Sequence, residues 1–400
     1  MSESRTRPIP ARPACDGRTQ DNLDALVALL AVNAAGVDRT ACFPEENLAA
    51  LRSAGYLGFL IPRRYGGMGR DLADLVTVAQ RLAGACLSTA MIWAMHCQQA
   101  DVLVRHAGPR LAAELLPRVA AGEVYLASVT TGTVTGGHLL SAADALERGI
   151  EEEILLRREA PVVTGGEHAD GFLITMRETA HADGHAVSLV YADRDALTVE
   201  ATGGWNTLGM RGTASGALKL SGAVPPDQVV GPPGGFREVA LDSMIPVGHL
   251  AWSACWLGAA RSSFSALLRW LSREQRDRLS SPLVHERLGR IRLDLELVSG
   301  YLGGVRQEVE RVRADRSRPD SAEVQIHLNS LKTAASELTY QAVDRMVQLA
   351  GLAVGYGADS PVPLERTLRD LRSAALNYSN DRLWTANGAL CLLDRGVTLL

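Results

Sequence analysis

The sequence lacks any cysteine arrangement that would bind a metal ion or build a disulfide framework. Its six cysteines are scattered singly, with no Cys-x-x-Cys pair and no Cys/His spacing typical of a zinc site. We therefore expect no metal centre, and a reducing, cytoplasmic environment fits the chain best.

Long apolar runs and an excess of positive charge are also missing. No apolar stretch reaches the roughly 18 to 20 residues that a membrane span needs, and the net charge of −4 offers no basic surface to nucleic acid. The first residues are charged and proline-containing, without the apolar segment of a signal peptide, so residues 1–20 are expected to form a disordered arm. These absences predict a soluble protein that has neither a membrane nor a nucleic acid as partner.

Hydrophobic periodicity divides the rest of the chain into three regions. Apolar residues keep helical spacing in residues 21–123 and again in residues 235–400. Between them, residues 124–231 contain short runs rich in β-branched or apolar residues, separated by glycine and aspartate turns. The pattern predicts an α+β protein with an N-terminal helical domain, a middle β-domain and a C-terminal bundle of about four helices.

The C-terminal quarter carries a recognisable set of motifs. Residues 348–351 read Gln-Leu-Ala-Gly, residues 363–366 read Pro-Leu-Glu-Arg, and residues 368–370 read Leu-Arg-Asp. Taken alone, the arginines of this segment would indicate a solvated, ion-paired helix face. In this order, the motifs resemble the "Gln-x-x-Gly…Pro-x-Glu-Arg…Arg-Asp" signature of the flavin-dependent acyl-CoA dehydrogenase family.

This resemblance implies a fold, a cofactor and an assembly. The family has a helical domain, a β-barrel-like middle domain and a four-helix bundle, binds FAD, and shares each FAD between subunits. By the match, Gln348 and Gly351 meet the FAD of a neighbouring subunit, in a homo-oligomer that we expect to be a dimer of dimers. Arg276 or Arg278 occupies the place of a family arginine that contacts the FAD pyrophosphate, and a guanidinium suits phosphate geometry.

Two segments of the β-domain resemble the family's flavin-binding strands. The loop 128–138 lies where the family has "Leu-Thr-Glu-Pro-Gly-x-Gly-Ser-Asp"; Val129 and Thr130 match Leu-Thr and Thr131 follows, but the Glu, Pro, Ser and Asp are missing. Residues 161–166 resemble "Trp-Ile-Thr-Asn-Gly", with Val163 and Thr164 beside the flavin and a valine in place of the aromatic ring. On its own the first segment is also compatible with a plain turn.

The family's catalytic base is not where the resemblance places it. An acyl-CoA dehydrogenase removes an α-proton with a carboxylate, but the two family positions for that glutamate hold Ser379 and Gly248 here. Asp381, two residues from Ser379, and His249, next to Gly248, are the candidate replacements, although a helix N-cap or an ion pair with Arg382 explains Asp381 at least as well. His96, in the middle of an apolar helix, is a further candidate, with a structural role as the alternative.

Three functions fit these motifs. The first, which we rank slightly ahead, is an FAD-dependent dehydrogenase that acts on an acyl-CoA or acyl-carrier-protein thioester with a relocated base, in a specialised, biosynthetic role. The second is a flavin monooxygenase on the same fold, which needs no α-proton base. The third is a homologue that binds or rearranges its substrate without redox chemistry.

Overall fold

The computed structural model describes residues 17–132, 138–149 and 152–397. The first helix begins at Gly17, so the last residues of the segment expected to be an arm are helical, while residues 1–16 lie outside the described part. Residues 133–137 of the glycine-rich loop also lie outside it.

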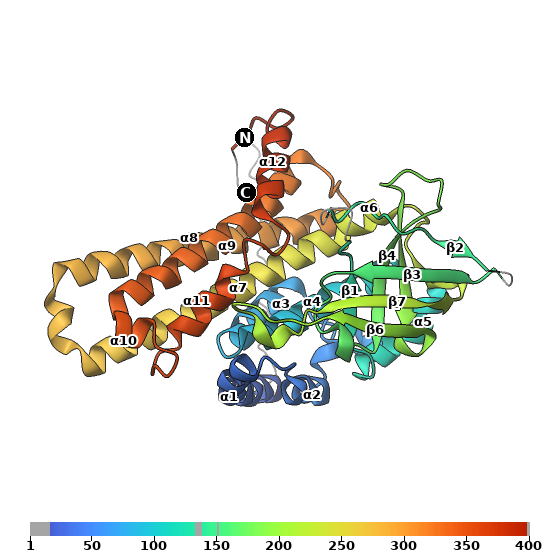
Figure 1. The fold of residues 1–400 in the computed structure, drawn as a ribbon. Coiled ribbons are helices and arrows are strands. Elements are labelled where there is room, and N and C mark those ends of the chain that lie inside the picture. The colour runs from blue at the N-terminus through green and yellow to red at the C-terminus, as the bar shows by residue number, and fades with distance from the viewer. Residues whose placement is uncertain (1–16, 133–137, 150–151, 398–400) are drawn as a thin grey trace.

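Helices precede and follow a middle region of strands, in the order that the sequence predicts (Figure 1). The N-terminal helices are α1 (Gly17–Thr40), α2 (Glu45–Ser53), α3 (Leu72–Ala83), α4 (Leu87–His106) and α5 (Pro109–Ala120). The strands are β1 (Leu126–Val129), β2 (Glu147–Arg148), β3 (Ile154–Ala160), β4 (Gly171–Arg177), β5 (Val187–Asp193), β6 (Leu197–Gly203), β7 (Ala217–Val224) and β8 (Val229–Val230). The C-terminal helices are α6 (Phe236–Val239), α7 (Ile245–Glu274), α8 (Pro282–Ala314), α9 (Ala322–Ala350), α10 (Leu352–Gly355), α11 (Leu364–Arg372) and α12 (Asn380–Leu390). The predicted α+β class is thus confirmed.

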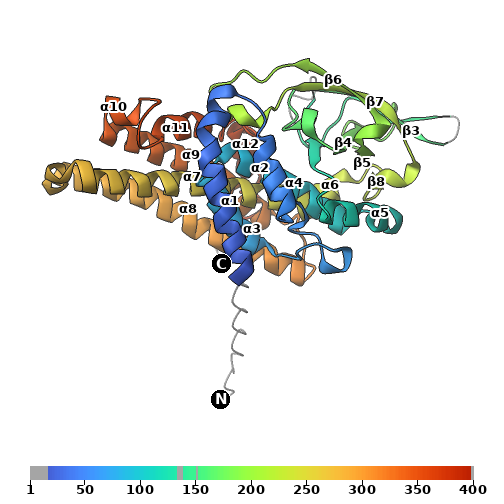
Figure 2. The same cartoon turned by 90° about the horizontal axis from the view of Figure 1, so that it is seen from below.

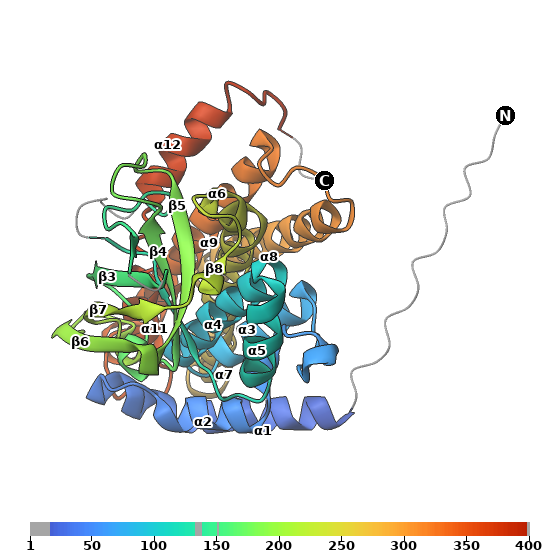
Figure 3. The ribbon, with the colours of Figure 1, turned by 90° about the vertical axis from the view of Figure 1, so that its right-hand side faces the viewer.

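The strands form two open four-stranded sheets. One has the order β1-β4-β5-β8, with β1 and β4 parallel, and the other is antiparallel with the order β2-β3-β7-β6. The expectation of a barrel-like middle domain therefore needs correction, because the described strands do not close into a barrel. Figure 3 shows the strands beside the N-terminal helices α3, α4 and α5.

Three long helices, α7, α8 and α9, make up most of the C-terminal bundle and extend away from the sheets (Figure 1). Helix α9 begins at an N-cap, Ser321, and ends at Gly351, whose φ of +81° is a left-handed conformation that favours glycine. Helix α1 crosses the outside of the molecule (Figure 2). Among the described helices, none combines the length and apolarity needed to cross a bilayer.

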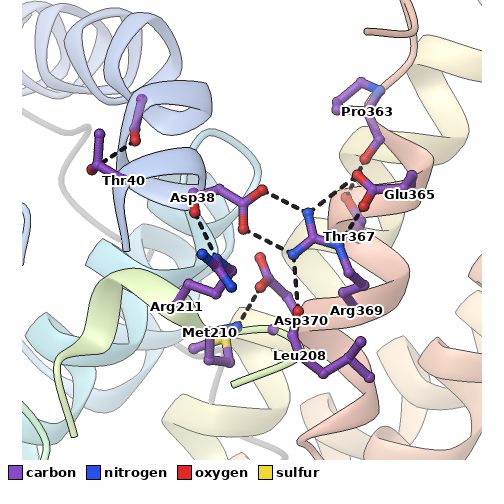
Figure 4. Close-up of polar contacts among 12 residues, drawn as sticks. Asp38, Thr40, Leu208, Met210, Arg211, Pro363, Glu365, Thr367, Arg369 and Asp370 are labelled. Atoms are coloured by element: carbon purple, nitrogen blue, oxygen red, sulfur yellow. Dashed lines mark hydrogen bonds and ion pairs between the residues drawn. The ribbon is translucent and has the colours of Figure 1, made fainter. Parts of the chain in front are cut away.

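One arginine joins the three regions (Figure 4). The guanidinium of Arg369, on α11, makes two bonds of 3.0 and 2.6 Å to the Asp38 carboxylate of α1 and donates to the Leu208 carbonyl at 2.9 Å. It also pairs with Glu365, one turn earlier on α11. We call this cluster the Arg369 junction. The neighbouring Asp370 is buried and accepts the Met210 N–H at 2.5 Å.

We predict that Arg369→Gln lowers the free energy of unfolding by about 3 kcal/mol, because it leaves a largely buried carboxylate and a carbonyl without their partner. Urea unfolding followed by circular dichroism measures this. Arg366→Gln on the same helix is the control, since Arg366 makes no ion pair or side-chain hydrogen bond with the described residues. An equal decrease in the free energy of unfolding in the two variants would show that the Arg369 junction does not stabilise the fold in this way.

Candidate active site

Two adjoining cavities lie between the sheets and the bundle. The first, which we call the His249 cavity, measures about 290 Å³, and the second, the Trp205 cavity, about 490 Å³. They share seven lining residues: Met95, Thr131, Val162, Thr164, Leu376, Asn377 and Tyr378. The walls are mostly apolar, with a few polar groups that come from the strand ends and from the segment after α11, as expected for a cofactor or substrate site.

A chain of three hydroxyl groups reaches the shared wall at Thr164. Thr213 Oγ1 donates to the Met210 carbonyl at 2.8 Å and lies 2.8 Å from Ser215 Oγ, which is 3.0 Å from Thr164 Oγ1. Each hydroxyl has one proton. If all three bonds form, the proton of Thr164 points to Ser215, and its oxygen offers lone pairs to the cavity.

Thr130 and Thr131, two of the predicted flavin contacts, line the His249 cavity. The Thr131 hydroxyl donates to the Val162 carbonyl at 2.8 Å, and its own carbonyl accepts from Arg158 at 2.7 Å. Arg158 is buried and pairs with Asp144 at 2.7 Å. A buried guanidinium thus holds the backbone at Thr131 in place. Val129 and Val163, the other two predicted contacts of this region, are buried and line neither cavity.

His96 is held inside the protein by bonds at both ring nitrogens. Nε2 lies 2.8 Å from the Leu57 carbonyl, and Nδ1 accepts the Leu126 N–H at 3.1 Å, so the proton must be on Nε2. Burial lowers the pKa of His96 to about 4. The ring does not line either cavity. These contacts favour the structural role that we weighed against catalysis.

His249 differs from His96 in which ring nitrogen carries the proton and in its exposure to a cavity. Nδ1 lies 3.1 Å from the Leu328 carbonyl, to which it donates, and the ring lines the cavity. Nε2 therefore carries a lone pair and no proton. Burial, assisted by the nearby Lys332, lowers the pKa of His249 to about 3, so the ring is a neutral acceptor and a weak base.

Neither family position for a catalytic glutamate supplies a carboxylate. A Cβ at Gly248 would lie 2.3 Å from Nε2 of Gln98, whose side chain fills that space and donates to the Met244 carbonyl at 2.6 Å. Ser379 lines the His249 cavity at the start of α12, but the neighbouring Asp381 is exposed and does not line it. Among the residues that the structure describes, no Asp or Glu lines either cavity.

A buried lysine supports the segment that replaces the family's glutamate motif. Lys332 Nζ donates to the Tyr378 carbonyl at 3.0 Å and to Asn380 Oδ1 at 2.7 Å. Burial lowers its pKa to about 7. Tyr378 has a positive φ of 52°, an uncommon conformation for a residue with a side chain, which these bonds help to hold.

The other predicted flavin contacts lie at the far end of the bundle. Arg278 donates to the Leu349 carbonyl at 2.9 Å, which places it beside Gln348 and Gly351. Gln348 is exposed and its side chain donates to the Asp344 carboxylate at 2.7 Å, and Arg276 is also exposed. The last α7 residue that lines either cavity is Trp256, and the helix continues for 18 more residues, about 27 Å, to its end at Glu274. These residues are therefore too distant to contact an isoalloxazine ring in their own chain's cavities.

Sequence reasoning missed several residues of the cavity walls: Gln98, Trp205, Trp252, Arg372 and Arg382. A glutamine within the apolar helix 87–106 was a detectable signal, because an uncharged polar side chain there needs a buried partner. Trp252 has a buried indole N–H without an acceptor among the described residues. Nothing in the local sequence indicates that Arg382 faces a cavity.

One group of possible metal ligands occurs elsewhere, although none was expected. Glu308, Glu323 and His327 bring ligand atoms within 4.8 Å of one another where α8 and α9 meet. His327 Nδ1 lies 2.9 Å from the Glu308 carboxylate, which raises the pKa of the ring. This ion pair accounts for the arrangement without a metal.

Family models match both helical regions of the chain. Residues 22–123 match "Acyl-CoA dehydrogenase, N-terminal domain", and residues 250–381 match "Acyl-CoA dehydrogenase, C-terminal domain". The chain is also similar to the "Probable acyl-CoA dehydrogenase FadE25" of Mycobacterium tuberculosis, with 26% identity over 358 residues and 86% of each chain covered.

Solved structures share the fold. FMN-bound TdsC from Paenibacillus sp. A11-2 has a TM-score of 0.84 at 20% identity, over 96% of this chain and 98% of that chain. Butyryl-CoA dehydrogenase from Megasphaera elsdenii has a TM-score of 0.80 at 17% identity, over 96% and 100%.

The buried histidines predict acid-sensitive stability. His96 and His249 have pKa values of about 4 and 3 in the folded chain, below the 6.5 of a free histidine, so the unfolded chain binds more protons at intermediate pH. The free energy of unfolding is then at its full value above pH 6.5 and decreases as the pH falls below 6.5. At pH 5 we expect each histidine to have lowered it by about 2 kcal/mol.

Urea titrations at pH 5 and pH 8 test this expectation. His96→Gln should reduce the difference by about 2 kcal/mol, whereas His181→Gln, at an exposed position, should leave it unchanged. A difference that is the same in wild type and His96→Gln would show that His96 is not buried as a neutral ring.

Proposed function

Because the chain belongs to the acyl-CoA dehydrogenase family, we propose that it is a flavin-dependent oxidoreductase whose isoalloxazine ring lies across the wall shared by the two cavities. A bound flavin supplies hydride acceptance or, once reduced, reaction with oxygen. The hydroxyl of Thr164 and the loop at Thr130 and Thr131 would meet the polar edge of the ring. Methionine and tryptophan side chains of the Trp205 cavity would cover its apolar part.

The geometry favours an oxygenase reaction over α,β-dehydrogenation. The observation that carries this proposal is the absence of Asp and Glu from the described cavity walls, since α-proton removal from a thioester needs a base within hydrogen-bonding reach. His249 is the group nearest to that role, but a pKa of about 3 makes it a weak proton acceptor. TdsC, which shares the fold, is described as a dibenzothiophene monooxygenase.

Dehydrogenation of an acyl-CoA or acyl-carrier-protein thioester is the second candidate. It is favoured by the lone pair on His249 Nε2, which is the atom that would accept the α-proton. The names of the relatives by sequence point to the same reaction. Asp381 would need to turn inward to take this role.

Anaerobic flavin spectroscopy separates the two reactions. We expect that a series of acyl-CoA thioesters leaves the absorbance of the oxidised flavin unchanged, and that oxygen is consumed only after an external reductant has bleached it. Bleaching by a thioester alone would establish dehydrogenation instead. In that case His249→Ala should slow the bleaching by about 10² to 10⁴, while Asp381→Asn should match the parent.

We further propose that the flavin is FAD and that its adenosine diphosphate part reaches the far end of the bundle in a second copy of the chain. The end of α7 that adjoins Arg278 is about 27 Å by helix length from Trp256, the last α7 residue on a cavity wall. Arg278 and Gln348 nevertheless both have polar groups beside the end of α9. An assembly of at least two copies would bring that end to a neighbour's flavin, as in the dimer of dimers we expect.

This proposal predicts a difference between FAD and FMN. Arg278→Gln should weaken FAD binding by about 10- to 100-fold, the value of a charge-assisted phosphate contact, but should leave FMN binding unchanged. Equilibrium dialysis with each flavin measures this, with the exposed Arg311→Gln as control. A stable FAD-loaded monomer in light scattering would contradict the shared site.

A further inference from the structure

One cation lines the His249 cavity without a partner. Arg382, in the first turn of α12, is half-buried and makes no ion pair and no side-chain hydrogen bond with the described residues. Most other arginines of the described chain that are half-buried or more have a carboxylate or carbonyl partner, as at the Arg369 junction. An unpaired guanidinium on an apolar cavity wall is therefore a group that a ligand can satisfy.

The surroundings of Arg382 add further positive potential. Ser379, which lines the same cavity, is the N-cap of α12, and no side chain caps this helix start. A helix N-terminus carries a partial positive charge and unpaired N–H groups. The pKa of the Tyr378 hydroxyl is raised by burial, and the positive charge of Arg382 opposes part of this rise.

The acidic groups near this edge are turned away or occupied. Asp381 is exposed and does not line the cavity. Glu337 accepts bonds from Asn380 and Trp384. Lys332 is buried behind the segment, bonded to the Tyr378 carbonyl. Because no Asp or Glu of the described chain lines the cavity, an anion that pairs with Arg382 there would come from a bound ligand.

We propose that Arg382 selects a substrate that carries a carboxylate, bound at the Ser379–Arg382 edge of the His249 cavity. This assignment rests on the proposed function, a flavin on the wall shared by the two cavities, and adds that the substrate enters the His249 cavity beside it. A carboxylate accepts two parallel N–H bonds from one guanidinium, which fixes its orientation as well as its charge. The remaining walls, formed by residues such as Met95, Leu126, Met244 and Ile245, suit an apolar body. The substrate class is therefore a small acid with an aryl or alkyl group.

Isothermal titration calorimetry on the flavin-loaded protein tests this with 4-phenylbutanoate and its uncharged amide, 4-phenylbutanamide. We expect the acid to bind at least about tenfold more tightly than the amide. Arg382→Gln should bring the two affinities within about threefold, Arg382→Lys should keep part of the preference, and Arg269→Gln, at an exposed position of α7, should keep all of it.

Equal binding of acid and amide by the wild-type protein would overturn the proposal, as would a preference that survives in Arg382→Gln. Calorimetry reports binding without a flavin signal. A protein that holds flavin but does not prefer the acid would thus refute the anion site alone, whereas a protein that holds no flavin would refute the proposed function.

Discussion

The Arg369 junction is the contact on which the arrangement of the site depends. Its guanidinium holds Asp38 of α1 and the Leu208 carbonyl at the same time, and the next residue, Asp370, accepts the Met210 N–H. The loop around Met210 and the segment that follows α11 both line the Trp205 cavity. One partly buried charge cluster thus connects two parts of the cavity wall that come from different regions of the chain (Figure 4).

Local sequence patterns were sufficient to predict the order of the three regions: helical, then β, then helical. Strand β4, Gly171–Arg177, has a local signal, because its run of apolar and β-branched residues lies between turn residues. Strand β6, Leu197–Gly203, has none, because most of its residues are exposed and it lacks a buried face that would produce a pattern. Thr130 and Thr164 were found through family motifs and lie on the cavity walls.

The features that decide the chemistry depend on contacts between distant residues. The bonds of His96 come from Leu57 and Leu126, more than 29 residues away on either side, so the sequence could not distinguish a structural ring from a catalytic one. Likewise, the space beside Gly248 is filled by Gln98, on another helix. Such packing follows from the fold as a whole and leaves no local signal.

Other side chains of this protein lie beside both of the alternative positions for the family's glutamate. At Gly248, Gln98 occupies the volume a longer side chain would need. At Ser379, a glutamate would stand three residues from the unpaired Arg382, which lines the same cavity. The guanidinium would pair with such a carboxylate and lower its pKa, which makes it a weaker base. A single substitution at either position would accordingly not recreate the family's base, because Gln98 and Arg382 would remain beside it.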